Sequence, residues 1–182
     1  MKKIDYILQN ERIKQAKKYI AGTTVLDIGC HFGELFKNVL KTKKISGDGI
    51  DDVLKTVIST KNYTLYPGLF PEDFKPTKTY DTITLLAVLE HIPIEKTKQN
   101  VSLFYQLLNV KGRVIITIPS KKVDIILSIL LFLKLIDGMD VHNHQDFDRE
   151  LIKEIFISNG FKLLVEKKFQ LGLNNLYVFE KI

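Results

Sequence analysis

The chain is 182 residues long, with 45% hydrophobic and 26% charged residues and a formal net charge of +6. These values are ordinary for a soluble globular protein, and the length favours one domain with a substantial core. A single cysteine excludes an internal disulfide framework. The first residues contain no long apolar region and no cleavage-site pattern, so we expect no signal peptide and a cytoplasmic location.

The positive charge raises the question of nucleic-acid binding. The lysines are spread along the chain, with only small clusters at residues 14–18 and 41–44. The sequence has no basic tail and no strand that combines aromatic and basic residues as RNA-binding modules do. We therefore interpret the charge as a solvated, lysine-rich surface and expect no nucleic-acid partner.

Apolar periodicity predicts that helices and strands alternate along the chain. The predicted helices cover residues 4–20, 34–40, 51–60, 94–108 and 149–158. The predicted strands cover residues 23–28, 44–50, 63–66, 80–86, 113–118, 161–170 and 176–182. This alternation is typical of an α/β protein with a doubly wound parallel sheet. The last two strands are too close for a crossover helix, so we expect an antiparallel hairpin at one edge.

The most informative stretch, residues 25–35, reads Val-Leu-Asp-Ile-Gly-Cys-His-Phe-Gly-Glu-Leu. It predicts a buried strand, a tight glycine turn and the start of a helix, and Asp51 follows at the end of the next apolar run. This order is typical of a βαβ unit that binds a nucleoside. A dinucleotide fingerprint needs glycine where this chain has His31 and Glu34, so the pattern argues against NAD or FAD.

The turn, with Asp27, Gly29 and Gly33, resembles motif I of the class I S-adenosylmethionine-dependent methyltransferases. Three later segments resemble the same family in order and spacing: the Leu-Glu-His region at 80–92, the block at 107–116 and the turn at 159–161. The resemblance implies a single methyltransferase domain over residues 1–182, with an N-terminal helix in 1–22. It further implies a Rossmann-like, mostly parallel seven-stranded sheet of order 3-2-1-4-5-7-6, with helices on both faces and the last strand antiparallel.

The resemblance also implies a site for the cofactor S-adenosylmethionine. In the family, the motif I acid helps to hold the methionine end and the acid after the second strand accepts ribose hydroxyls; Asp27 and Asp51 match these positions. A carboxylate suits a diol because its two oxygens accept both donors. Asp51 would alternatively cap the helix predicted over 51–60, and the two roles are compatible. The predicted cofactor-binding residues are Asp27, Gly29, Cys30, Gly33, Asp51, Leu69 and Leu86.

Two positions depart from the family's pattern. His31 stands where glycine is commonest, so its imidazole must project towards solvent or the ligand. The acid that often follows the third strand is missing, and residues 67–70 read Pro-Gly-Leu-Phe. We therefore expect apolar contact and backbone groups to hold the adenine. Cys30 is interpreted as a small structural residue of the turn, not as a nucleophile.

Glu90 and His91 follow the predicted strand at 80–86, at the edge where doubly wound sheets place their ligands. A hydroxyl or carbon acceptor must lose a proton, and a histidine that titrates near neutrality is the natural base. We therefore predict Glu90 and His91 as catalytic residues; the alternative is a helix cap or a structural pair. Similar methyltransferases bind a divalent ion through Glu-x-x-Glu-His, but Ala87 replaces the first acid here.

Two further histidines, His142 and His144, are spaced to face one site from an extended segment. We predict that His142 and His144 contact the substrate and that no metal binds, with a metal site shared with Glu90 and His91 as the alternative.

Residues 123–136 are apolar nearly all round a helix. As a helix they would rise about 21 Å, too short for a bilayer core of about 30 Å, so we expect no stable membrane insertion. They fall between the strand predicted at 113–118 and the helix predicted at 149–158, where the methyltransferases that this chain resembles insert substrate-covering elements. The resemblance therefore implies a lid-like insertion over 121–146. A contact in a homodimer, a helix lying on a membrane and ordinary packing on the sheet stay open.

Together these patterns predict an enzyme that transfers a methyl group from S-adenosylmethionine to a small-molecule or lipid-like acceptor, with oxygen as the favoured acceptor atom. A catalytically silent methyltransferase-like binding protein and an RNA methyltransferase are the alternatives. The sequence does not identify the acceptor.

Overall fold

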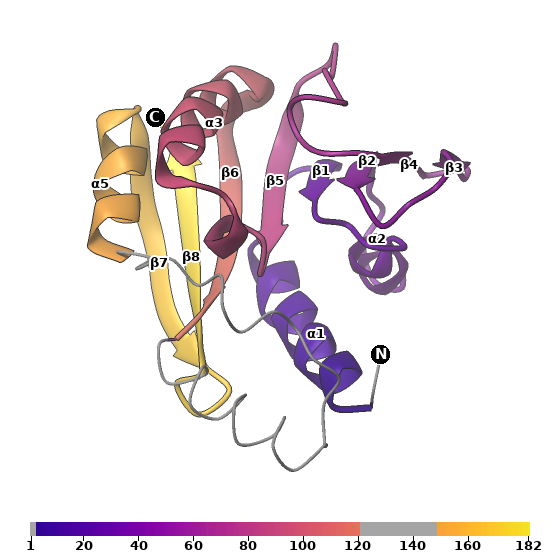
Figure 1. Cartoon of the computed structure of the whole chain (residues 1–182), viewed down its shortest axis with the longest axis horizontal. Helices are drawn as coiled ribbons and strands as arrows, with labels where there is room; N and C mark the ends of the chain where they lie inside the picture. The colour runs from indigo at the N-terminus through magenta and orange to yellow at the C-terminus, as the bar shows by residue number, and fades with distance from the viewer. Residues whose placement is uncertain (1–2, 121–148) are drawn as a thin grey trace.

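The computed structural model describes residues 3–120 and 149–182 of the chain. In Figure 1 the strands lie side by side in one sheet, with helices on both faces. The helical elements are α1 (Lys3–Ala16), η1 (Lys17–Tyr19), α2 (Glu34–Val39), η2 (Leu89–His91), α3 (Ile94–Leu107) and α5 (Arg149–Ser158). The strands are β1 (Thr24–Ile28), β2 (Ser46–Asp51), β3 (Ile58–Ser59), β4 (Tyr63–Pro67), β5 (Tyr80–Leu86), β6 (Leu108–Pro119), β7 (Phe161–Phe169) and β8 (Asn174–Lys181).

Within the described residues, eight strands form one sheet in the order β3-β4-β2-β1-β5-β6-β8-β7. β1 pairs in parallel with β2 and β5, and β4 and β6 extend the sheet in parallel on either side. β8 pairs antiparallel with both β6 and β7. Apart from the two-residue β3, the order is the predicted 3-2-1-4-5-7-6. The predicted fold class and the closing hairpin are therefore confirmed.

The helix predicted over residues 51–60 is wrong. The Val53 amide donates a hydrogen bond to Asp51 Oδ1 (3.0 Å) in a tight turn, and the chain then forms β3, antiparallel to β4. Among residues 52–60 only Leu54 is buried, so a helix would have had no apolar face to place against the sheet. Asp51 therefore caps a turn and not a helix.

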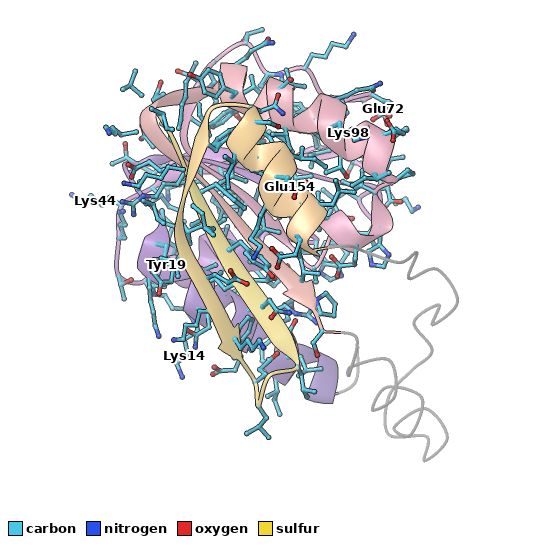
Figure 2. All side chains as sticks on the ribbon, turned by 90° about the vertical axis from the view of Figure 1, so that its left-hand side faces the viewer. Lys14, Tyr19, Lys44, Glu72, Lys98 and Glu154 are labelled. Atoms are coloured by element: carbon cyan, nitrogen blue, oxygen red, sulfur yellow. The ribbon has the colours of Figure 1, made fainter. Side chains whose placement is uncertain are left out.

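Two hydrophobic cores cover the two faces of the sheet. Successive residues of a strand point to opposite faces, so Val25 of β1 packs with α1 and α2 whereas Leu26 packs with α3 and α5. Figure 2 shows this separation: Lys14 of α1 lies on one side of the sheet, and Lys98 of α3 and Glu154 of α5 lie on the other. Because both faces are covered, β5 and the second half of β6 read as nearly continuous runs of apolar residues and threonine.

A hydrogen-bonded aspartate fastens the amino ends of β1 and β5. Asp81 Oδ2 accepts the Thr23 amide (2.7 Å), the Thr24 amide (3.0 Å) and the Thr24 hydroxyl (2.9 Å), and Oδ1 accepts Asn109 Nδ2 (2.8 Å). Burial raises the pKa of Asp81, but the hydrogen bonds from Asn109, Thr24 and Thr23 outweigh it and lower the pKa to about 2. This end of the sheet is therefore held by a carboxylate in its charged form.

Replacing Asp81 with Asn should lower the free energy of unfolding by roughly 2 kcal/mol at pH 7, because several hydrogen bonds to a charged group are lost. The folded pKa lies below the ordinary value of 3.8, so the native protein should lose this contribution as the pH falls from about 4 towards 2. Urea unfolding at pH 7 and pH 2.5 measures the difference. The exposed Glu154→Gln variant is the control and should behave as the native protein at pH 7. A deficit in Asp81→Asn that is equal at both pH values would contradict the assignment.

Candidate active site

Backbone hydrogen bonds hold the turn between β1 and α2 against the end of β2. The Gly29 and Cys30 amides both donate to the Ile50 carbonyl, at 2.9 and 3.2 Å, and the Gly33 amide donates to the Cys30 carbonyl at 2.8 Å. Gly29, His31 and Gly33 have positive φ angles of 74°, 48° and 82°, a region that favours glycine. The turn therefore follows one tightly bent path at the carboxyl ends of β1 and β2.

The loop after β5 packs directly against this turn. A Cβ atom added to Gly29 would lie 2.2 Å from Cγ2 of Val88, so a larger residue requires that side chain to move. Val88 precedes the Leu-Glu-His segment of η2. Motif I and the residue that precedes the Leu-Glu-His segment, which are distant in the sequence, are therefore in contact at one edge of the sheet.

Asp51 orders the turn with both carboxylate oxygens. Oδ2 accepts the His31 amide at 2.7 Å, and Oδ1 accepts the Val53 amide at 3.0 Å. Each carboxylate oxygen has two lone pairs, so each retains one acceptor position. The residue is partly exposed at the end of β2. It is thus arranged to accept two further donors, as a vicinal diol would supply.

His31 is accommodated in the turn by Glu34. Its Nδ1 lies 3.3 Å from Glu34 Oε2, which also accepts the Phe32 amide at 3.0 Å. The imidazole side chain is 34% exposed, so it lies at the surface of the turn and not inside it. The turn therefore accommodates a histidine at the position where the family most often has glycine.

Asp27 is a buried carboxyl group at the centre of the site. The residue is 3% exposed, and the Thr84 hydroxyl donates a 2.6 Å hydrogen bond to its Oδ1. Burial raises the pKa of Asp27 to about 7; the Thr84 hydrogen bond opposes this rise, and the negative charges of Asp51 and Glu34 add to it. Three carboxyl groups around one turn favour a ligand that brings positive charge.

Cys30 is a buried thiol that packs between the turn and β2. A Cβ atom added to Gly49 would lie 2.7 Å from its Sγ, and the thiol is 3.5 Å from the His31 carbonyl. Burial is the largest of the effects that raise the pKa of Cys30 far above its ordinary value, and the charge of Asp27 adds to it. Because the thiolate is the reactive form, this arrangement supports the structural interpretation of Cys30.

The segment after β5 places Glu90 and His91 in different surroundings. The chain bends at Ala87, where φ is 59° and the amide donates to the Thr117 carbonyl of β6 at 2.9 Å. Glu90 is 5% exposed, and its Oε2 has no hydrogen-bond partner among residues 3–120 and 149–182, whereas His91 is exposed. Burial raises the pKa of Glu90 to about 7, against the opposing effects of its own backbone amide and the positive charge of Arg12.

The two apolar residues predicted to contact the cofactor lie at the same edge of the sheet. Leu86 is the last residue of β5 and is partly buried. Leu69 is 56% exposed in the loop after β4, where its amide donates to Asp73 Oδ2 at 2.8 Å. The amide of the preceding Gly68 donates to the Asp51 carbonyl at 3.2 Å, so this exposed leucine offers an apolar surface near the end of β2.

Several predicted features fall outside the part of the chain that the structure describes. These are His142 and His144, the lid-like insertion over 121–146 and the apolar segment 123–136. Among residues 3–120 and 149–182, no three His, Cys, Asp or Glu side chains are arranged to hold a metal ion. No helix in these two ranges is long and apolar enough to cross a membrane.

Sequence reasoning missed three residues that shape the site. Thr84 binds Asp27, Glu34 accepts the Phe32 amide, and Val88 fills the space beside Gly29. The role of Glu34 could have been predicted from the sequence, because an acid in the first turn of a helix interacts with the free backbone amides there. Thr84 faces Asp27 only through the β1–β5 register, which the sequence does not reveal.

The sequence matches a family model described as a methyltransferase domain, over residues 2–166. This range contains the turn, Asp51 and the segment after β5. The chain belongs to this methyltransferase family. The match confirms the predicted enzyme class, a methyltransferase that depends on S-adenosylmethionine, and with it the predicted cofactor. A search of curated proteins gave no significant sequence match.

The same fold occurs in solved methyltransferase structures. Magnesium protoporphyrin IX methyltransferase from Synechocystis PCC 6803, with bound SAH, has a TM-score of 0.66 at 18% identity, covering 95% of this chain and 81% of that chain. A cyclopropane synthase from Mycobacterium tuberculosis has a TM-score of 0.67 at 13% identity, covering 95% and 84%. An O-methyltransferase family protein from Burkholderia thailandensis has a TM-score of 0.68 at 14% identity, covering 96% and 56%. At these identities the likeness shows the fold.

Gly29 and Gly172 form a matched pair for testing the turn. Both have positive φ (74° and 83°), so alanine at either position should destabilise the protein by about 1–2 kcal/mol. An added Cβ meets Val88 at Gly29, whereas at Gly172 no atom of the described residues lies within 4 Å. We expect Gly29→Ala to weaken binding of S-adenosylhomocysteine by about tenfold or more, and Gly172→Ala to leave it unchanged. Calorimetric titration measures both affinities; equal affinities in the two variants would show that the turn does not bind the cofactor.

Proposed function

We propose that this methyltransferase transfers the methyl group of S-adenosylmethionine to an oxygen atom of a small-molecule acceptor. The observation that carries the cofactor site is the acidic turn, where Asp27, Glu34 and Asp51 surround a bent backbone at the carboxyl ends of β1 and β2. The cofactor has an ammonium group, a sulfonium centre and a ribose diol. The ammonium group and the ribose diol would each meet a carboxyl group at the turn.

Each part of the cofactor is assigned to residues whose geometry suits it. Asp27 would hold the ammonium group, because a cation beside it would offset the cost of burying the negative charge of the carboxylate. Asp51 would accept the ribose hydroxyls with the lone pairs that His31 and Val53 leave free. Leu69 would cover the adenine. When bound, the cofactor supplies a methyl group that its sulfonium already activates, so the turn's role is to orient it.

The acceptor would bind beside η2, because Val88 links this loop to the cofactor turn. A hydroxyl must lose its proton when its oxygen is methylated. His91, exposed at the end of η2, would accept that proton on a ring nitrogen. Glu90, whose buried Oε2 has no hydrogen-bond partner in the described part of the chain, would orient the acceptor. That one solved neighbour is an O-methyltransferase family protein also supports oxygen.

The untested expectations belong to the same proposal. They are substrate contacts by His142 and His144, a lid over 121–146, a cytoplasmic location and the absence of a nucleic-acid partner.

His91→Ala tests the assigned base. Transfer of labelled methyl groups to catechol should fall by about a hundredfold, the usual share of a general base. Transfer to 4-nitrocatechol, a more acidic phenol, should fall much less, because that acceptor is already ionised at the assay pH. The affinity for S-adenosylhomocysteine should be unchanged. Lys98→Ala on the exposed face of α3 (Figure 2) is the control and should keep full turnover.

Two results would count against the proposal. An equal loss with both catechols would show that His91 does not act as a base. Tight binding of S-adenosylhomocysteine without methyl transfer to any hydroxyl compound would favour a catalytically silent binding protein.

A further inference from the structure

The turn between β7 and β8 carries an exposed leucine in an unfavourable backbone conformation. Gln170, Leu171 and Gly172 have positive φ angles of 51°, 57° and 83°. This region favours glycine and asparagine, and a leucine in it is strained. Leu171 is also fully exposed, at 101%. Neither the backbone of the turn nor packing against the described residues explains a leucine here, which points to a contact with a partner.

The beginning of α1 lies beside this turn. Gln170 Nε2 donates a hydrogen bond to the Leu8 carbonyl at 3.2 Å, and Lys167 Nζ donates to Gln15 Oε1 at 3.3 Å. The two contacts are about 10 Å apart along α1 and about 10 Å apart along β7. The end of β7 and the beginning of α1 therefore run side by side in opposite directions.

α1 adds two exposed apolar side chains to the same end of the molecule. Tyr6 is 58% exposed and Ile7 is 59% exposed, directly before the Leu8 carbonyl that holds the hairpin. In Figure 1 the yellow turn of the hairpin and the indigo beginning of α1 both lie at the lower end of the molecule. We call Tyr6, Ile7 and Leu171 the apolar tip.

The apolar tip lies at the edge of the sheet that carries the cofactor turn. Phe169 at the end of β7 pairs with Asn174 at the start of β8, and Asn174 also pairs with Pro119, the last residue of β6. β6 is parallel to β5, and β5 is parallel to β1, so the strands end at this edge. A partner that bound the apolar tip would therefore face the carboxyl edge of the sheet.

Positive charge borders the apolar tip. Lys167 and Lys168 are exposed on β7 just before the turn. Two acids of the same two elements, Glu11 and Glu166, each form an ion pair with another lysine, at 3.1 and 3.2 Å. The whole chain has a net charge of +6. A partner of this surface is therefore expected to combine apolar groups with negative charge.

A membrane surface with anionic lipids has this combination. Protruding apolar side chains enter the boundary between headgroups and acyl chains, while neighbouring lysines approach the negative headgroups. A second copy of the chain fits less well. Three side chains supply far less than the roughly 800 Å² per partner that a stable dimer buries. In a two-fold symmetric contact the lysines would also face their own copies.

We propose that the apolar tip docks this protein on membrane surfaces that contain anionic lipids. The docking is peripheral and reversible, and it turns the carboxyl edge of the sheet towards the lipid headgroups. The inference goes beyond the proposed function, because it requires neither bound cofactor nor a particular acceptor.

A tryptophan at the tip tests the contact directly, because the chain contains no tryptophan. The emission of Leu171→Trp should shift to shorter wavelength with vesicles of equal phosphatidylglycerol and phosphatidylcholine, and brominated lipid should quench it. Val110→Trp is the matched control. Val110 is 80% exposed near the start of β6, at the opposite edge of the sheet, so its emission should not change.

Leu171→Asn separates docking from folding. Sedimentation with the same vesicles should show an affinity about tenfold lower, because the largest exposed apolar group of the turn is lost. The urea midpoint without vesicles should stay the same or rise, because asparagine adopts a positive φ more readily than leucine. Val110→Asn should keep the native affinity.

A pair of lysines on one strand tests the contribution of charge. Lys168→Gln should lower the affinity for the anionic vesicles about fivefold. Lys162→Gln is the matched control, because Lys162 is also exposed on β7 but lies at the other end of the strand. It should bind as the native protein does. Vesicles of phosphatidylcholine alone should bind the native protein much more weakly.

Four outcomes would overturn the proposal. They are equal binding to both kinds of vesicle, vesicle affinity that Leu171→Asn leaves unchanged, a lower urea midpoint in that variant, and a native dimer that the variant converts to a monomer in analytical ultracentrifugation. The last result would assign the apolar tip to a second copy of the chain. Because no S-adenosylmethionine is present in these experiments, a failure of the proposed methyl transfer would not affect them.

Discussion

The Ile50 carbonyl at the end of β2 is the acceptor on which the cofactor turn depends. Two consecutive amides, those of Gly29 and Cys30, donate to it, and the next residue, Asp51, accepts the His31 amide. The end of one strand thus fixes the backbone of the turn and also places the acid predicted to bind ribose. Because parallel β1 and β2 are neighbours in the sheet, this arrangement follows directly from the strand order.

Two aspartates at opposite ends of the sheet show how environment separates structural from functional groups. Asp81 accepts four hydrogen bonds and its pKa is about 2, so it is charged at neutral pH and fastens the strands. Asp27 accepts one from Thr84, and burial raises its pKa to about 7. A buried carboxyl group that accepts only this one hydrogen bond from the described residues is suited to a cationic ligand.

The sequence predicted those turns and strands that are determined by neighbouring residues along the chain. The turn at Gly29 and Gly33 and the bounds of β5 followed from glycine placement and apolar runs. Residues 51–60 were wrongly predicted as a helix because their composition permits one, whereas the absence of a buried face decides against it.

Which side chains contact one another at this edge of the sheet depends on strand register, so these contacts could not be predicted from the sequence. Thr84 beside Asp27 is a pair that only the assembled sheet creates. The motif residues Asp27, Asp51 and Glu90 could be named in advance, but not their burial, nor the raised pKa of Asp27 and of Glu90. The sequence therefore predicted residues that the fold brings to one edge of the sheet, whereas the fold shows which groups surround each of them.

The pH dependence of S-adenosylmethionine binding tests the central claim most directly. Asp27 has a pKa near 7 in the free protein, and a bound cation should lower it, so binding should release a proton below pH 7. Affinity should fall roughly fivefold between pH 7 and pH 6, a range in which the ligand's amino group stays protonated. Calorimetry in two buffers of different ionisation enthalpy measures both quantities. Proton release that is absent in Asp27→Asn would support the account; proton release that is equal in both proteins, or affinity that does not change with pH, would contradict it.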